Sequence, residues 1–110
     1  MISINGTTIE MTRGDTLKTY LTLHDAEGDL YTPDPNDRIR FAAKKTYNDA
    51  EPLIIKEIPV DSLLLVLNPE DTKPLSAPAS YVYDIEITYA NGDVDTFINK
   101  AKLKLTEEVY

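Results

Sequence analysis

The segment from Tyr81 to Leu105 constrains the fold more than any other, because two alternating runs of side chains meet at Asn91-Gly92. Asn-Gly accepts the positive φ angles that a tight hairpin turn demands. In the first run, alternation places five side chains on one face: Tyr81, Tyr83, Ile85, Ile87 and Tyr89. A register shift of one residue would bury Asp84 and Glu86 instead, so the register is strongly specified. The hairpin therefore predicts a β protein whose sheet has one wet face and one dry face.

The second run of this hairpin changes face along its length. A two-residue turn at Asn91-Gly92 pairs Tyr89 with Val94, Ile87 with Thr96 and Ile85 with Ile98. Inward positions would then be even-numbered, whereas the apolar residues from Ala101 to Leu105 are odd-numbered. We therefore predict a β-bulge or strand break at Asn99-Lys100. The alternative is a three-residue loop, Ala90-Asn91-Gly92, which turns Phe97 inward and needs no bulge.

Similar alternation predicts short strands elsewhere in the chain. The expected strands are Thr8–Thr12, Thr16–His24, Arg38–Lys45, Leu53–Ile58 and Ser62–Leu67, with a short return at Leu30-Tyr31 after a turn over residues 25–29. The expected inward residues are Ile9, Met11, Leu17, Thr19, Leu21, Leu23, Ile39, Phe41 and Ala43. The apolar density of Leu53–Ile58 and Ser62–Leu67 suggests that these two strands are central in a sheet.

One short helical turn is expected near residues 69–74. Asn68 suits the N-cap, Pro69 suits the first helical position, and the acidic pair Glu70-Asp71 suits the positive end of the helix dipole. Pro74 ends the turn.

These elements predict an all-β fold, an immunoglobulin-like antiparallel β-sandwich of about seven to nine strands. The length of 110 residues predicts a single domain over residues 1–110. Sandwiches of this type often place a tyrosine at the corner that follows such a helical turn. Tyr81 or Tyr83 suits that role, and a plain core tyrosine is the alternative.

Composition narrows the classes of function. The chain carries a formal charge of −8, which argues against nucleic acid and against an anionic membrane surface as partners. It has no cysteine, so disulfides and thiolate zinc sites are excluded. No apolar run approaches the roughly 20 residues of a spanning helix, and no Sec signal follows Met1. We expect a protein that is made and folded in a reducing cytoplasm.

Candidate catalytic and metal-binding groups are few. The only histidine, His24, would need one of four serines for a triad, namely Ser3, Ser62, Ser76 or Ser80, and none lies in a Gly-x-Ser-x-Gly setting. The oxygen-rich group Asp34-Asn36-Asp37 lacks the spacing, the glycine and the closing glutamate of a calcium loop. In a second group, Asn91-Asp93-Asp95, turn chemistry explains Asn91 and Asp93 without a metal. Asp84 and Glu86 share one strand face rather than flanking a cleft. We therefore predict no catalytic residue, no cofactor and no metal site, and a protein that is not an enzyme.

Basic residues fall in two rows, Lys100, Lys102 and Lys104 in one and Arg38, Arg40 and Lys44 in the other. Outward charges protect sheet edges from unwanted pairing. An interface with an acidic neighbour is the alternative explanation.

The order of segments along the whole chain resembles a family of phage proteins. The segments that carry the resemblance are Arg13-Gly14-Asp15-Thr16, Asp37-Arg38-Ile39-Arg40-Phe41-Ala42, Leu67-Asn68-Pro69-Glu70-Asp71-Thr72, Tyr81-Val82-Tyr83-Asp84-Ile85, Asn91-Gly92-Asp93-Val94-Asp95-Thr96-Phe97 and Lys102-Leu103-Lys104-Leu105-Thr106-Glu107-Glu108-Val109. In this order they resemble the immunoglobulin-like N-terminal domain of phage baseplate upper proteins and related short prophage structural proteins.

The resemblance implies a non-catalytic virion structural protein of the tail or baseplate. It would bind other phage structural proteins, with self-association into a homo-oligomer as a further option. It would pass through the bacterial host cytoplasm during assembly. We expect the contact surfaces at Ile2–Met11 and at the C-terminal strand, since chain ends often supply sheet edges. The alternative function is a sandwich that binds a carbohydrate or another cell-surface ligand, with Tyr20, Tyr47, Tyr31 and Phe97 as candidate exposed aromatics.

Overall fold

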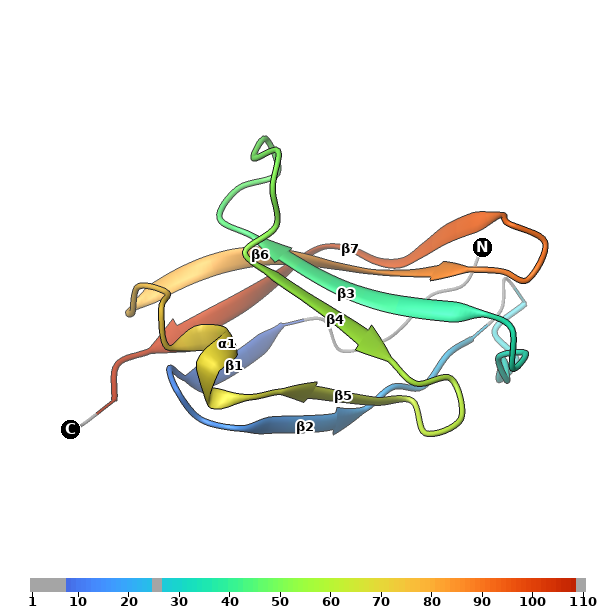
Figure 1. Cartoon of the computed structure of the whole chain (residues 1–110), viewed down its shortest axis with the longest axis horizontal. Helices are drawn as coiled ribbons and strands as arrows, with labels where there is room; N and C mark the ends of the chain where they lie inside the picture. Colours follow the sequence, from blue (N-terminus) through green and yellow to red (C-terminus); the bar gives the residue numbers. More distant parts are fainter. Residues whose placement is uncertain (1–7, 25–26, 109–110) are drawn as a thin grey trace.

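Seven strands form two layers with one short helix between their ends (Figure 1). This computed structural model describes residues 8–24 and 27–108. The elements are β1 (Ile9–Thr12), β2 (Leu17–Tyr20), β3 (Arg38–Lys44), β4 (Ile54–Ile58), β5 (Leu64–Leu67), α1 (Pro69–Thr72), β6 (Ala79–Thr88) and β7 (Val94–Thr106). One layer is a five-stranded sheet in the order β1-β7-β6-β3-β4, and the other is the β2-β5 pair. The prediction of an all-β sandwich with seven to nine strands is confirmed.

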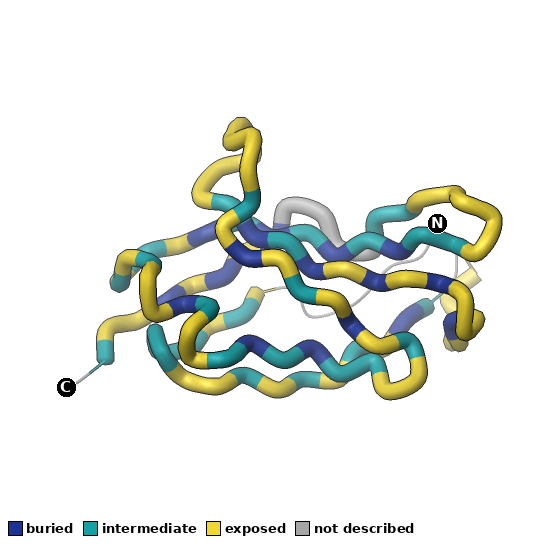
Figure 2. Tube along the Cα trace, in the orientation of Figure 1, coloured by how far each residue is buried: buried dark blue, intermediate teal, exposed yellow. Residues whose placement is uncertain are grey.

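The dry interior lies between the two layers, as the alternating burial along each strand shows (Figure 2). The residues predicted to point inward from β3 and β6 are buried, namely Ile39, Phe41, Ala43, Tyr81, Tyr83, Ile85 and Ile87. From the smaller layer, Leu65 and Leu67 close the core. Apolar side chains of alternating parity therefore bury one face of each sheet, which is the main favourable contribution to folding.

The first and last strands pair in parallel, unlike the rest. Ile9 lies opposite Leu103 and Thr12 lies opposite Thr106 in a parallel ladder. The prediction of an antiparallel sandwich is wrong at this one pair, because β7 runs beside β1 in the same direction. From Leu103 to Leu105, β7 has a partner on each side, so that part of the C-terminal strand is interior and not the edge that we expected.

The hairpin between β6 and β7 combines features of both predicted alternatives. The Tyr89 N–H donates to the Asp93 carbonyl at 2.7 Å, so the loop is the three-residue one and the two-residue turn is wrong. Thr88 lies opposite Val94, but Ile85 lies opposite Ile98 and Tyr83 opposite Ala101. The register therefore shifts twice, and the second shift confirms the predicted irregularity at Asn99-Lys100. The side chains of residues 97–100, including Phe97, lie outside the described ones.

β4 lies at the edge of the five-stranded sheet and pairs with β3 alone among the described strands. The prediction of a central position is therefore wrong for β4, and it is wrong for β5 as well, because β5 belongs to a two-stranded sheet. Its alternate residues Ile54 and Ile58 are buried, whereas Ile55 remains 56% exposed on the outer face. Apolar density thus reflects two different surfaces here: a core face, and an exposed apolar row on the outside.

The strand expected over Thr16–His24 keeps its alternation but not its pairing. The β2-β5 ladder ends at Tyr20, and farther along His24 forms a single bridge with Leu30. The Tyr31 N–H donates to the Leu23 carbonyl at 2.8 Å, so the expected return at Leu30-Tyr31 is present as a bridge only. The expected turn includes residues 25 and 26, which lie outside the described residues.

The predicted helical turn is confirmed as α1, with Asn68 at its N-cap and Pro69 at its first position. The Asn68 N–H donates to the Asp71 carboxylate at 2.7 Å, as expected of the acidic residue in a capping box. Asp71 also pairs with Lys56 of β4 at 2.8 Å. α1 is therefore tied to the edge of the five-stranded sheet, although it is only one turn long.

Tyr81 serves as the corner tyrosine, one of the roles left open by the sequence. Its hydroxyl accepts a hydrogen bond from the Ser76 N–H at 2.9 Å and donates to the Ser76 carbonyl at 3.1 Å. The ring itself is buried, and the Lys45 ammonium lies 4.9 Å from its centroid. One side chain thus fixes the crossover between α1 and β6 to the core.

Removing only this hydroxyl tests its contribution. We expect Tyr81→Phe to lower the free energy of unfolding by about 1–2 kcal/mol, because two backbone groups of Ser76 lose their partner. Urea unfolding monitored by circular dichroism measures the change. Tyr20→Phe, at a ring that is 73% exposed, is the matched control and should leave stability unchanged. Equal stability of the two variants would contradict the corner role.

Candidate functional site

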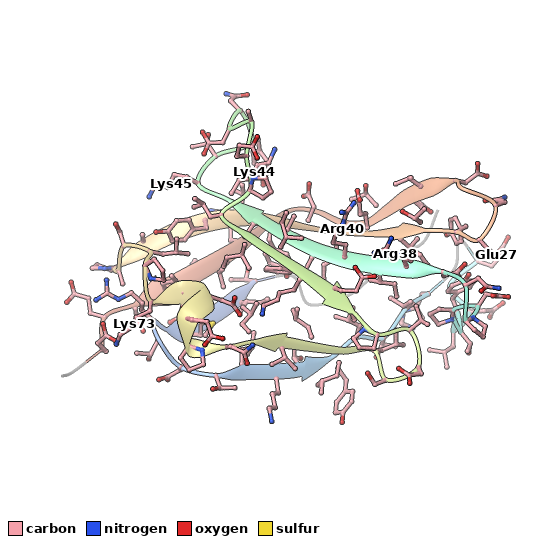
Figure 3. The ribbon with its side chains drawn as sticks, in the orientation of Figure 1. Glu27, Arg38, Arg40, Lys44, Lys45 and Lys73 are labelled. Carbon is pink, nitrogen blue, oxygen red and sulfur yellow. The ribbon has the colours of Figure 1, made fainter. Side chains whose placement is uncertain are left out.

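The outer face of the five-stranded sheet carries the main candidate site. Arg38 and Arg40 project from β3 toward this face (Figure 3). Arg38 donates to Glu57 of β4 at 3.0 Å, and Arg40 donates to Glu86 of β6 at 3.1 Å. These cross-strand pairs are exposed, so solvent screening leaves them only a small contribution to stability. They show that this basic row is matched by acids of the same chain.

The loop over residues 45–53 rises from this face, on the side away from β2 and β5 (Figure 1). Asp49 organises it: its carboxylate accepts from the Thr46 N–H at 3.1 Å, and its backbone carbonyl accepts from the Lys44 ammonium at 2.8 Å. The Leu53 N–H donates to the Ala43 carbonyl at 2.7 Å and returns the chain to the sheet. Local hydrogen bonds therefore define the shape of this protruding loop.

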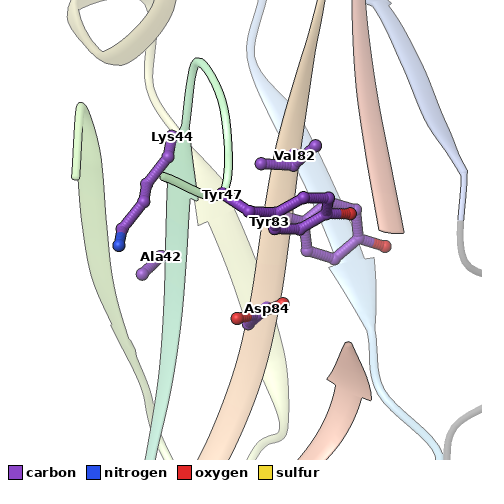
Figure 4. A pocket seen from close by; sticks show the side chains of 6 residues that line it. All are labelled: Ala42, Lys44, Tyr47, Val82, Tyr83 and Asp84. Carbon is purple, nitrogen blue, oxygen red and sulfur yellow. The ribbon is translucent and has the colours of Figure 1, made fainter. Parts of the chain in front are cut away.

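Two adjoining hollows lie between this loop and the sheet. The larger, of about 300 Å³, is lined by Arg40, Ala42, Lys44, Ala50, Pro52, Ile55, Asp84 and Glu86. The smaller, of about 70 Å³, adds Tyr47, Val82 and Tyr83 to three residues of the larger one, Ala42, Lys44 and Asp84 (Figure 4). We call the two together the loop hollow. Three strands and one loop contribute to it.

The chemistry of the loop hollow is an apolar floor within a charged rim. Ala42 on β3 and Ile55 on β4 lie opposite one another and form part of the floor. Tyr47 is 45% exposed, and burial together with the nearby Asp84 carboxylate raises the pKa of its hydroxyl. A tyrosine hydroxyl can act as a hydrogen-bond donor and as an acceptor. The arrangement suits binding of a small polar molecule that also has an apolar face.

A second cluster joins three distant parts of the chain near the C-terminal end of β7. Glu108 accepts hydrogen bonds from Arg13 and, at 2.7 Å, from Lys73. Arg13 also donates to the Leu75 carbonyl at 3.0 Å, and the Gly14 N–H donates to the buried Thr72 hydroxyl at 2.8 Å. These contacts lie within one chain, so the cluster holds the β1-β2 connection against α1 and the last strand.

The charge on Glu108 gives this cluster a pH dependence. Hydrogen bonds from Lys73 and then Arg13 lower the pKa of Glu108 below its ordinary value of 4.5. A lowered pKa in the folded state stabilises the protein above the ordinary value, and this contribution is lost as pH falls through the folded-state pKa. We expect Glu108→Gln to melt at a lower temperature than the original chain at pH 7, with the difference narrowing as the pH falls from 4.5 to 3.

Melting temperatures of both chains across this pH range measure the effect. Glu107→Gln, at the exposed neighbouring position, removes the same charge and is the matched control. A Glu108→Gln difference that persists undiminished at pH 3 would contradict the ionic origin of the contribution.

The group Asp34-Asn36-Asp37 is organised as a structural loop. The Asp37 side chain is buried and accepts from the Tyr31 hydroxyl at 3.0 Å, from the Asp34 N–H at 2.9 Å and from the Ala90 N–H at 3.0 Å. Burial, followed by the hydrogen bond to Asp37, raises the pKa of Tyr31 to about 12. Asp37 therefore ties the loop before β3 to the β6-β7 turn.

The other candidate groups occupy turn and strand ends. In the β6-β7 turn the Asn91 amide oxygen accepts from the Asp93 N–H at 2.9 Å, while Asp95 lies 3.5 Å from the Tyr89 hydroxyl. His24 lies in its bridge with Leu30, and Ser76 lies at the corner bound by Tyr81. Ser3 lies outside the described residues. Within residues 8–24 and 27–108, no group of three or more histidine or acidic side chains is placed to hold a metal ion.

The three candidate exposed aromatics whose side chains are described lie in different environments. Tyr20 is 73% exposed on the outer face of β2, and Tyr47 stands in the loop hollow. Tyr31 packs edge-on against Tyr89 with ring centroids 6.3 Å apart, so it belongs to the loop packing around Asp37. Of the three whose side chains are described, Tyr47 lines a hollow that also gathers charged side chains from two strands.

Tyr47 was predicted from the sequence to be an exposed aromatic, but the hollow beside it was not predicted. The missed residues are Ala42, Ile55 and Val82, which occupy outward positions on three strands. An available signal was their apolar character at positions where the alternation predicts polar side chains.

Comparison with family models and with curated proteins does not assign this chain to a family. The chain matches no protein-family model. It likewise matches no curated protein sequence. Among the described residues, no helix is long and apolar enough to cross a membrane.

Proposed function

We propose that this chain is a non-catalytic structural module of a phage or prophage tail or baseplate, which binds other virion proteins. The proposal starts from the family-like order of segments along the sequence. The observation that carries it in the fold is the apolar outer face of the β2-β5 layer. Tyr20 lies there opposite Leu64, and Lys18 lies opposite Val66.

This face has the composition of a contact surface. Tyr20 is 73% exposed, while Leu64 and Val66 are half-buried beside it. A two-stranded sheet is only marginally stable by itself, and within the described residues neither β2 nor β5 pairs with a further strand. A neighbouring protein that packs on this face would bury the tyrosine and cover the outer side of the β2-β5 pair. Aromatic side chains are enriched at the centres of such interfaces.

The N-terminal edge supports the same proposal. β1 pairs with β7 and with no second strand among the described residues, so one side of Ile9–Thr12 remains an edge. Sheet edges accept strands from partner chains. We therefore keep the expected contact surface as a proposal for residues 8–11. The rest of the expected range Ile2–Met11, residues 2–7, lies outside the described residues.

Particles purified from an induced lysogen test the proposal. We expect mass spectrometry to find the chain in the particles, and Tyr20→Asp to reduce its incorporation. Val94→Asp, at another large exposed apolar residue, is the matched control and should be incorporated normally. Absence of the original chain from both particles and assembly intermediates would refute the proposal.

A second candidate function, a ligand-binding sandwich, is favoured by one observation. The loop hollow joins an aromatic ring, an apolar floor and a charged rim on a face opposite the β2-β5 layer. Binding there would leave the proposed protein contact at Tyr20 accessible.

A further inference from the structure

The loop hollow has features that select a class of ligand. Its floor is made of short and branched apolar side chains, including Ala42, Ile55 and Pro52. Two large exposed apolar side chains line it: Ile55 is 56% exposed and Tyr47 is 45% exposed. An exposed apolar group of this kind, rimmed by polar residues, marks a binding surface.

The rim supplies two side chains that donate hydrogen bonds and two that accept them. Arg40 and Lys44 bring donors from β3, and Asp84 and Glu86 bring acceptors from the adjacent strand β6. Their formal charges cancel, so the rim does not favour an ion of either sign. The net charge of −8 on the whole chain further disfavours anionic ligands. An uncharged ligand with many hydroxyl groups matches this rim, because each hydroxyl both donates and accepts.

The aromatic side chain adds a flat apolar surface. Tyr47 extends from the loop toward Val82 and Asp84 on β6 (Figure 4). A pyranose ring has one face of C–H groups and an equator of hydroxyls. It can therefore contact the tyrosine and the apolar floor with its C–H groups while its hydroxyls reach the rim.

We propose that the loop hollow binds one uncharged pyranose unit of a glycan, with Tyr47 and the Ala42–Ile55 floor against the sugar and with the side chains of β3 and β6 as its hydrogen-bonding rim. This inference deepens the second candidate function and does not depend on membership of a virion. The larger hollow, about 300 Å³, is at the small end of ligand sites, which suits a single ring. So few ligand atoms in an open site give a Kd on the order of 1 mM.

Titration of the isotopically labelled full chain tests the site. The probes are the methyl glycosides of glucose, galactose and N-acetylglucosamine, with glucuronate as the charged counterpart. We expect at least one neutral glycoside to shift the amide resonances of Ala42, Tyr47 and Asp84, with the resonance of Tyr20 unmoved. Glucuronate should bind less tightly than the corresponding neutral sugar.

Two variants assign any binding to this hollow. Tyr47→Ala should weaken it about tenfold, since one aromatic contact surface is lost. Tyr20→Ala removes an exposed tyrosine from the opposite layer and should leave the affinity unchanged. The amide spectrum of each variant outside residues 40–56 and 80–88 checks that the fold is retained. If Tyr47→Ala disturbs the fold, Ala42→Leu, which fills the floor, takes its place.

Three outcomes would overturn the inference. The first is the absence of any shift at tens of millimolar of every neutral glycoside. The second is binding that Tyr47→Ala and Ala42→Leu leave unchanged. The third is a loss of incorporation into particles by Tyr47→Ala without any sugar binding, which would make the hollow a protein contact. Absence of the chain from particles would refute the tail module and leave the sugar titration unaffected.

Discussion

Replacing Asp37 by asparagine is expected to lower the free energy of unfolding by about 3 kcal/mol. Asp37 is only 5% exposed, and its two carboxylate oxygens accept three hydrogen bonds, two from the loop before β3 and one from the β6-β7 turn. An asparagine offers one oxygen and one NH2 group. Either orientation of the amide places a donor against a backbone N–H, from Asp34 or from Ala90. A buried donor without an acceptor is strongly unfavourable, and here it would separate the loop before β3 from the β6-β7 turn.

Urea unfolding with a fitted slope measures this change, because an unchanged slope shows that stability alone was altered. Asp34→Asn is the matched control in the same loop. The Asp34 carboxylate is exposed and accepts from the Asn36 N–H two residues away at 2.9 Å. Its replacement should lower stability by less than about 1 kcal/mol. Equal losses for the two variants would show that Asp37 is not the residue that joins the two loops.

Local alternation was enough to predict most of the core. The inward positions of β3 and β6 follow from parity alone, since Ile39, Phe41 and Ala43 alternate with charged or small residues. The helical turn was predictable for the same reason. Asn68, Pro69 and Asp71 fix it through contacts within four residues. Features determined by neighbours in the sequence are therefore readable from the sequence.

Loop length and strand register were only partly predictable. Asn91-Gly92 favours a two-residue turn, but Gly92 has φ of +96° as the last residue of a three-residue loop. That loop leaves Val94 60% exposed and places Asp95 beside the Tyr89 hydroxyl. Two register shifts then return Ala101 and Leu103 to the core. The sequence required a change of face, but where the change occurs depends on cross-strand packing.

The order of the strands in the sheet could not be predicted from the alternation of side chains. Leu53–Ile58 has the apolar density of a central strand, yet β4 is an edge. Lys56 of β4 reaches Asp71 of α1 at 2.8 Å, and an inward-pointing charge is a common feature of protected edges. The loop hollow was hidden for a related reason: it depends on residues 45–53 folding over outward side chains from three strands. Such a surface exists only once non-local strands are adjacent.

Phe41→Ala is expected to have the largest effect of the single substitutions considered, a loss of about 3–5 kcal/mol in the free energy of unfolding. Phe41 is fully buried on β3, between β6 and β4, and its ring centroid lies 5.0 Å from that of Tyr83. Truncation removes the apolar area of the ring and leaves a cavity that the surrounding strands cannot close. A domain of this size has a total stability of about 5–15 kcal/mol, so near the lower end of that range the variant would keep only about 0–2 kcal/mol and up to about half of its molecules would be unfolded.

Tyr20→Ala is the matched control for the loss of an aromatic ring from a strand. Its ring is 73% exposed on β2, so we expect a loss of less than about 1 kcal/mol, mainly from strand propensity. Thermal and urea unfolding of both variants measure the contrast. The contrast also separates the two proposed roles of aromatic side chains in this chain, since Phe41 should affect folding and Tyr20 should affect incorporation into particles. A Phe41→Ala chain as stable as the Tyr20→Ala chain would mean that the two layers do not enclose a dry core at β3.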